Sequence, residues 1–124
     1  MTSPVPSAHL DTPITIEIMN GPEDGRVVVC DKTQISIGRA TDNTIHLPYD
    51  HLISRRHAKI VAFGDSLTLS DLHSTNGTFV GRERVHEGTV LPPNTLFRVG
   101  ATLLMAKRPA AEASRRKGAR PRGR

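Results

Sequence analysis

The sequence predicts an all-β fold, a two-sheet antiparallel β-sandwich of about ten or eleven short strands. Short stretches alternate apolar with polar residues, which is the period of a strand that buries one face. Gly, Pro, Asn and Asp separate these stretches, and they are the residues that turns require. No stretch has the 3.6-residue period of an amphipathic helix. Aromatic residues make up 3% of the chain, so Val, Ile and Leu must supply most of the core.

The first four expected strands end at turn residues or at proline. Residues 14–19 and 34–37 alternate apolar and polar side chains, so each should bury one face. Residues 26–30 are a run of mainly β-branched residues, which favour strands. Residues 45–47 place two apolar side chains two positions apart, and Pro48 ends this strand because proline cannot donate a ladder hydrogen bond.

The second half of the chain continues the same pattern. Residues 58–62 and 67–69 alternate apolar and polar side chains. Residues 78–80 follow an Asn-Gly pair, which is typical of a tight hairpin turn. Residues 96–99 and 102–106 form the last two expected strands. The 124 residues suffice for one small domain with tails.

Charge divides the chain into a body and a tail. The net charge of +5 hides eight basic residues and one acidic residue in positions 107–124, which leaves a charge of −2 on residues 1–106. We therefore expect a disordered leader over residues 1–12, a folded domain over 13–107 and a disordered basic tail over 108–124. The body is mildly acidic and poor in aromatics, which argues against a nucleic-acid-binding sandwich. The tail has two open interpretations, a solvated segment, which we favour, or a nucleic-acid contact.

Cysteine usage and hydropathy indicate the compartment. Cys30 is the single cysteine, so no intrachain disulfide can form, and we expect it to be a small core residue. The sequence shows neither a signal peptide nor an apolar run that could span a membrane. The six histidines lack the spacing of a metal site, so we expect no metal and no cofactor. A monomeric cytoplasmic protein is the expectation.

Three predicted loops hold polar and basic residues that the strand pattern does not explain. They are Gly38-Arg39, Ser54-Arg55-Arg56-His57 and Ser74-Thr75-Asn76-Gly77-Thr78. If a sandwich brings them to one end, they offer guanidinium groups, hydroxyls, an amide and backbone N–H groups. This combination suits a phosphate dianion, because Arg makes charge-assisted hydrogen bonds to its oxygens. The loops lack a carboxylate dyad, an activated nucleophile and a metal cluster, so we do not expect an enzyme.

Four segments closely resemble the signature of the forkhead-associated (FHA) family, in the same order and at the same spacing. They are Gly38-Arg39, Asn43-x-Ile45-x-Leu47, Ser54-x-x-His57-Ala58-x-Ile60 and Ser74-Thr75-Asn76-Gly77-Thr78-Phe79-Val80. The resemblance covers about residues 14–107. It implies an FHA-type sandwich that binds a phosphothreonine-containing protein, or a Ser/Thr kinase, without catalysing a reaction.

The resemblance also implies a role for individual residues. Arg39 and Ser54 would contact the phosphate, Arg55 the phosphate or the peptide, Thr75 the phosphate and the threonine methyl, and Asn76 the peptide main chain. Residues expected to support the loops are Gly38, His57 and Gly77. Leu52 lies two positions before the motif serine and would contact the third residue after the phosphothreonine, which implies an apolar preference there.

Each of these residues also has a simpler interpretation. Arg39 and Arg55 could be solvated surface charges, since most arginines are exposed. Ser54 could cap its own backbone, and Asn76-Gly77 could be an ordinary hairpin turn. Ser54 with His57 is the only formal nucleophile–base pair, and no acid that could orient the histidine is evident. An FHA-like domain that has lost phosphate binding is a further alternative, against which the complete set of site residues argues.

Overall fold

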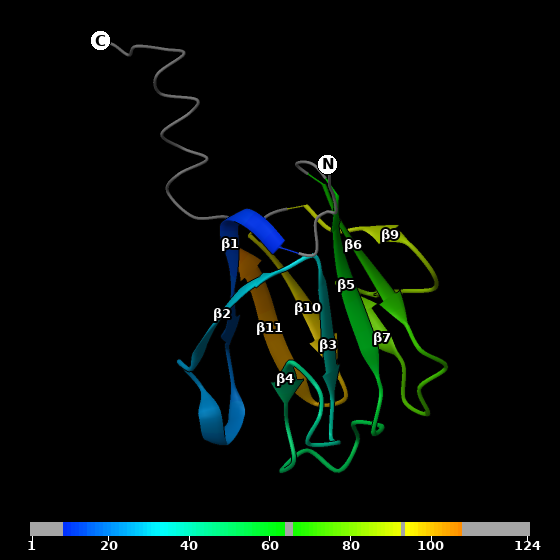
Figure 1. The fold of residues 1–124 in the computed structure, drawn as a ribbon. Helices are drawn as coiled ribbons and strands as arrows, with labels where there is room; N and C mark the ends of the chain where they lie inside the picture. The colour runs from blue at the N-terminus through cyan, green and yellow to red at the C-terminus, as the bar shows by residue number, and fades with distance from the viewer. Residues whose placement is uncertain (1–8, 64–65, 93, 108–124) are drawn as a thin grey trace, which may run out of the picture.

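The structure is a computed structural model that describes residues 9–63, 66–92 and 94–107. Within these residues eleven strands form two sheets that pack face to face (Figure 1). The one helical element in these described ranges is a single 3-10 turn, η1 (Gly21–Glu23). The predicted all-β sandwich is therefore confirmed. The expected basic tail, residues 108–124, and most of the expected leader lie outside the described residues.

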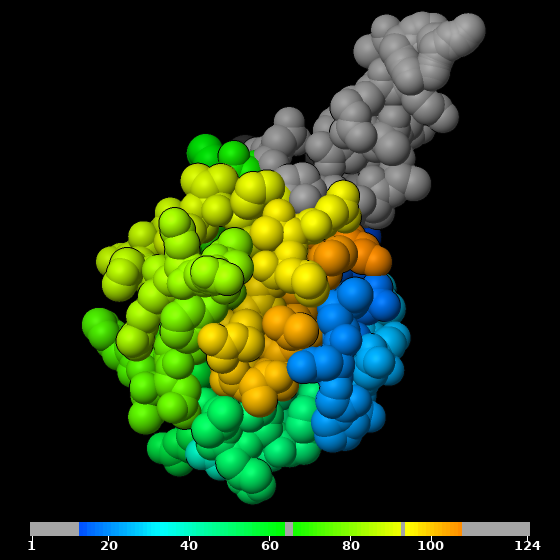
Figure 2. Space-filling model, turned by 180° about the vertical axis from the view of Figure 1, so that it is seen from behind, coloured from blue at the N-terminus to red at the C-terminus, as the bar shows by residue number. Residues whose placement is uncertain are grey.

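The two sheets have six and five strands. The six-stranded sheet has the order β2 (Val27–Lys32), β1 (His9–Ile18), β11 (Thr102–Lys107), β10 (Thr95–Val99), β7 (Thr78–Val80) and β8 (Glu83–Arg84). The five-stranded sheet has the order β4 (Ile45–His46), β3 (Gln34–Gly38), β5 (Ala58–Phe63), β6 (Ser66–Asp71) and β9 (Thr89–Val90). Figure 2 shows the outer face of the six-stranded sheet, where β1 and β2 in blue lie beside β11 in orange and β10 in yellow.

The core between the sheets is aliphatic, as the low aromatic content predicts. Every second residue of β1 is buried from Ile14 to Ile18, and the same alternation places Ile35 and Ile37 of β3 inside. Phe97 is the one large aromatic side chain that is fully buried. Cys30 is also buried, and desolvation, with a smaller effect of nearby Asp31, raises the pKa of its thiol to about 11. A thiol of that pKa stays protonated and unreactive at neutral pH, which fits the expected core role.

Three details differ from the expectation. Strand β1 begins at His9, four residues before the expected start of the domain, with His9 opposite Lys32 and a register irregularity between His9 and Ile14. Strands β3 and β4 run parallel, because the intervening loop folds back along β3 and Thr44 Oγ1 accepts a hydrogen bond from the Ser36 N–H. The two-residue strands β8 and β9 were not predicted, since so short a strand shows no periodicity.

The connections that matter for function gather at one end of the sandwich. They are the β3–β4, β4–β5 and β6–β7 loops, which Figure 1 shows at the lower end of the molecule. In the part of the chain that the structure describes, no helix has the length and apolarity needed to cross a membrane. The sandwich thus serves as a rigid support that presents three loops on one side.

Candidate functional site

Hydrogen bonds join the three polar loops into one surface. The Arg39 N–H donates to the Ser54 carbonyl over 3.1 Å, which ties the β3–β4 loop to the β4–β5 loop. The Thr75 N–H donates to Ser54 Oγ over 3.2 Å, and Asn76 Nδ2 donates to the Leu52 carbonyl over 2.9 Å. The β6–β7 loop is therefore tied to the β4–β5 loop as well. All five predicted contact residues lie on these loops, as does Leu52.

Arg39 is exposed but its direction is fixed. Its Nε donates to the Ile53 carbonyl over 2.7 Å, and among the described residues its two terminal nitrogens have no hydrogen-bond partner. The outer edge of the guanidinium thus remains available to an anion. Arg55 is exposed on the neighbouring loop, and its carbonyl accepts the Ala40 N–H over 3.2 Å. Two guanidinium groups are therefore carried by adjacent, hydrogen-bonded loops.

Gly38 permits the close approach of these two loops. A Cβ added at Gly38 would lie 2.1 Å from the Arg55 carbonyl oxygen, far inside van der Waals contact. Asn43 fills the space beside it, and its Nδ2 donates to the carbonyls of Ala40 at 2.9 Å and Arg55 at 2.8 Å. Any side chain at Gly38 would push Arg55 outward. The supporting role that the sequence suggested for Gly38 thus has a steric explanation.

His57 is fully buried and bridges two loops. Its Nδ1 accepts the Ser54 N–H over 3.0 Å, so the ring proton must sit on Nε2, which donates to the Gly77 carbonyl over 2.8 Å. Burial lowers the pKa of His57 below its ordinary value, despite smaller raising effects of the Gly77 carbonyl, Asp71 and Asp50. The ring is therefore neutral at physiological pH. Both nitrogens are engaged with backbone groups, which leaves neither free to act as a base for Ser54.

A carboxylate that the sequence interpretation missed supports the β6–β7 loop. Asp71 accepts hydrogen bonds from the Ser74 hydroxyl, the Ser74 N–H and, at 2.8 Å, the Thr78 hydroxyl. Burial by itself would raise the pKa of Asp71, but these hydrogen bonds outweigh it and the pKa is lowered. Ser74 Oγ in turn accepts the Gly77 N–H over 2.9 Å, where Gly77 has the left-handed φ of 86°. Asp71 and Ser74 thereby hold the Thr75-Asn76-Gly77 turn in place.

A second missed carboxylate holds the β4–β5 loop. Asp50 is buried and accepts hydrogen bonds from the Leu52 N–H at 2.9 Å, the Ala101 N–H at 2.8 Å and the Thr102 hydroxyl at 2.7 Å. It thus fastens the loop that carries Leu52 and Ser54 to the β10–β11 turn. Leu52 is a local partner, but Ala101 and Thr102 lie about fifty positions away in the sequence, so no local pattern could have revealed that Asp50 joins these two segments.

Comparison with known proteins is consistent with this geometry. The family model described as "FHA domain" matches residues 35–100, which is more than half of the chain and includes all three loops. The chain belongs to the FHA family. FHA domains are recognition modules, and the resemblance seen in the sequence is confirmed.

Individual relatives are about one-third identical to this FHA domain over the aligned residues. The FHA domain-containing protein FhaB of Mycobacterium tuberculosis (strain ATCC 25618 / H37Rv) is 33% identical over 87 residues, 70% of this chain and 56% of FhaB. The chain thus spans about half the length of that curated relative. A structure from a study of phosphothreonine-dependent FHA domain interactions matches with a TM-score of 0.68 and 32% identity, covering 77% of this chain and 96% of the other. The FHA domain of FhaA, solved with the intracellular domain of another protein, matches with a TM-score of 0.66 and 32% sequence identity. The match covers 76% of this chain and 99% of the FhaA domain chain.

The His57 bridge predicts a pH-dependent stability. A histidine whose folded pKa lies below the unfolded value of 6.5 binds fewer protons in the folded state. The free energy of unfolding should therefore be highest above pH 6.5 and fall as the pH is lowered from there, by at most about 1.4 kcal/mol per pH unit. Urea unfolding between about pH 8 and pH 5 measures this slope.

Two variants separate His57 from the other histidines. The slope should persist in His51→Gln, which removes an exposed imidazole from the β4–β5 loop. It should be lost in His57→Gln, which cannot be protonated. The lowered pKa of Asp71 affects stability only below its ordinary value of 3.8, outside this window. A wild-type unfolding midpoint that does not change between pH 8 and pH 5 would contradict the assignment.

Proposed function

We propose that this FHA domain binds phosphothreonine on a partner protein and acts downstream of a Ser/Thr protein kinase. One observation carries the proposal: Arg39 is held by its Nε on the Ile53 carbonyl, its terminal nitrogens have no partner among the described residues, and its backbone N–H is bonded to the Ser54 carbonyl. The solved relatives support it, since one was studied for phosphothreonine-dependent interactions. The cytoplasm is the proposed setting, because a buried thiol without a disulfide partner suits a reducing compartment.

Each proposed contact uses a group that the structure leaves available. Arg39 and Arg55 supply countercharge to a phosphothreonine that carries about −1.5 to −2 charges near pH 7. Ser54 Oγ accepts the Thr75 N–H, so its own proton can be donated to a phosphate oxygen. Asn76 donates one amide N–H to Leu52, which leaves its carbonyl and second N–H for the peptide main chain. Thr75 lies between Ser54 and Asn76, where its side chain would contact the phosphate and the threonine methyl.

We further propose that the domain binds without performing chemistry. A serine nucleophile needs a base that can take its proton, and His57 is the imidazole that the structure bonds to the Ser54 backbone. Its two nitrogens are occupied by the Ser54 N–H and the Gly77 carbonyl. The ring therefore holds the loops in place and cannot accept the Ser54 hydroxyl proton without breaking one of these bonds.

The first prediction of the proposed function concerns Arg39. Each hydrogen bond to a charged group is worth about 1.5–3 kcal/mol, so Arg39→Ala should weaken phosphopeptide binding by about a hundredfold or more. Isothermal titration calorimetry with a phosphothreonine peptide measures the loss. Arg82→Ala is the matched control, since Arg82 is exposed on the β7–β8 turn and the charge change is the same. Unchanged binding by a folded Arg39→Ala domain would reject the site.

The second prediction concerns the methyl group of phosphothreonine. Burying one methyl is worth about 0.8 kcal/mol, so a phosphothreonine peptide should bind at least about fourfold more tightly than the matched phosphoserine peptide. Fluorescence anisotropy with two peptides that differ only in this methyl gives the ratio. The unphosphorylated peptide, as the control, should not bind. Equal affinity for the two phosphopeptides would show that no pocket for the methyl exists.

The third prediction concerns Leu52, whose side chain is 48% exposed while its carbonyl is fixed by Asn76. We propose that this leucine contacts the third residue after the phosphothreonine. A peptide with Leu at that position should bind a few-fold more tightly than one with Ser, because each buried methylene adds about 0.8 kcal/mol. Leu52→Ser should abolish the difference, whereas Leu96→Ser, a comparably exposed leucine on β10, should keep it. A difference that survives in Leu52→Ser would assign the preference to another residue.

A further inference from the structure

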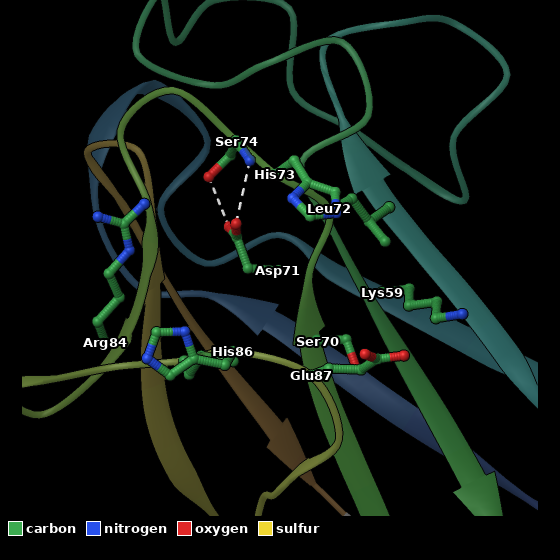
Figure 3. Close-up of a pocket in the computed structure, with 10 residues that line it drawn as sticks. Lys59, Ser70, Asp71, Leu72, His73, Ser74, Arg84, His86 and Glu87 are labelled. Atoms are coloured by element: carbon green, nitrogen blue, oxygen red, sulfur yellow. Dashed lines mark hydrogen bonds between the residues drawn. The ribbon is translucent and has the colours of Figure 1, made fainter.

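A cavity of about 710 Å³ lies beside the β6–β7 loop (Figure 3). Its walls come from Lys59 on β5, from His73 and Ser74 on the β6–β7 loop, and from the segment Arg84 to Glu87 that joins β8 to β9. None of the proposed phosphate contacts lines it. The cavity is thus a separate feature at the binding end of the domain.

The side chains around this cavity offer mainly N–H donors. Lys59 and Arg84 make no side-chain hydrogen bond or ion pair with any residue that the structure describes, and the same holds for the imidazoles of His73 and His86. The carboxylate of Asp71, at the centre of Figure 3, is already occupied by Ser74 and Thr78. Glu87 is the other lining carboxylate and has no side-chain partner among the described residues, so one carboxylate faces two cationic groups and two imidazoles. The unoccupied groups therefore favour an anionic ligand over a cationic one.

The cavity and the proposed phosphate site share one wall. Ser74 lines the cavity, and its hydroxyl oxygen holds the Gly77 N–H of the Thr75-Asn76-Gly77 turn. Arg84 lies against the same turn, since a Cβ added at Gly77 would be 3.2 Å from its guanidinium carbon. His73 connects the two features along the chain and has a φ of 59°, a left-handed conformation that is sparsely populated by residues other than glycine. Such backbone conformations cluster at ligand-binding sites.

We propose that the cavity binds a second anionic group of the same phosphorylated partner, either an acidic side chain or a second phosphorylated residue. Arg84 and Lys59 supply the charge, and His73 and His86 supply further donors. The inference rests on the proposed phosphothreonine site and extends it, because a segment bound at the Asn76-Gly77 turn has this cavity directly beside it. A carboxylate and a phosphate present the same chemistry to these donors, so the peptides must distinguish them.

The test compares extended peptides with a short phosphothreonine core. One set carries a neutral extension of Gln and Ser, a second set has Glu in place of the Gln residues, and a third set has one phosphoserine in the extension. Each extension is placed in turn before and after the phosphothreonine core. Dissociation constants are measured by fluorescence anisotropy with the wild-type domain. We expect an anionic extension on one side to tighten binding by about tenfold, which is the effect of one charge-assisted hydrogen bond. The larger gain identifies carboxylate or phosphate as the preferred group.

Variants locate the effect in the cavity. Arg84→Gln and Lys59→Gln should each remove most of the gain, measured as the ratio of the affinities for the extended and the core peptide, and Lys59→Gln should leave the affinity for the short core within about twofold. Arg82→Gln is the matched control, since Arg82 is exposed two positions from Arg84 and does not line the cavity. Amide resonances of His73, Arg84 and His86 should shift in NMR titrations with the extended peptide and not with the core alone.

The outcomes separate this inference from the proposed function. Failure of the core phosphopeptide to bind would overturn the phosphothreonine site and, with it, the role of the cavity. Tight binding of the core with no gain from any anionic extension would overturn the cavity alone. A gain that persists in both Arg84→Gln and Lys59→Gln would likewise reject it, because the extension would then contact another surface.

Discussion

The hydrogen bonds of the buried His57 ring are the constraint on which the binding end of this FHA domain depends. One ring nitrogen accepts the N–H of Ser54 and the other donates to the carbonyl of Gly77, so a single side chain fixes the distance between two loops. The backbone of His57 also belongs to both sheet and loop, since its N–H donates to Ile37 and its carbonyl accepts from Leu72. The two loops are therefore bonded through His57 to the five-stranded sheet of the sandwich. An aliphatic residue in its place would leave a buried N–H and a buried carbonyl unsatisfied, which is costly.

Two carboxylates extend this support on either side. Asp50 holds the loop before Ser54 to the β10–β11 turn, and Asp71 holds Ser74 and Thr78 around the Asn76-Gly77 turn. Both are largely buried, and their oxygens accept hydrogen bonds from backbone N–H groups and hydroxyls, which stabilises the loop geometry. Their oxygens are occupied by donors within the loops, and neither forms an ion pair with Arg39 or Arg55 among the described residues, so these two arginines stay available to a phosphate. The positive character of the site survives on a domain whose folded body is mildly acidic.

The sequence was informative wherever structure follows from a local pattern. Alternation located strands such as β5 and β6, and the positions of Arg39, Ser54 and Asn76 followed from motif spacing. Strands β8 and β9 were missed because two paired residues carry no period, and the parallel pairing of β4 depends on how the 39–44 loop folds. Asp50 and the cavity near Arg84 were missed for a related reason, since only the folded chain brings together their residues, such as Thr102 and Asp50. Asp71 is different, because its partners Ser74 and Thr78 lie three and seven positions further along the chain, and this short spacing was a local signal.

The arrangement of the site also bears on the affinity that it can reach. Binding a charged peptide costs the free energy of ordering the side chains that contact it, about 0.5–1.5 kcal/mol for each long one. Arg39 has already lost part of that freedom, since its Nε is held on the Ile53 carbonyl, and Asn76 is held on Leu52. These two side chains lose that freedom when the domain folds, because their partners belong to the domain itself and not to the peptide. Lys59 and Arg84 have no such restraint among the described residues, so an anion in the cavity would have to order them. The same number of charged contacts should therefore yield less affinity in the cavity than at Arg39, which makes the cavity suited to modulating a partner already held by its phosphothreonine.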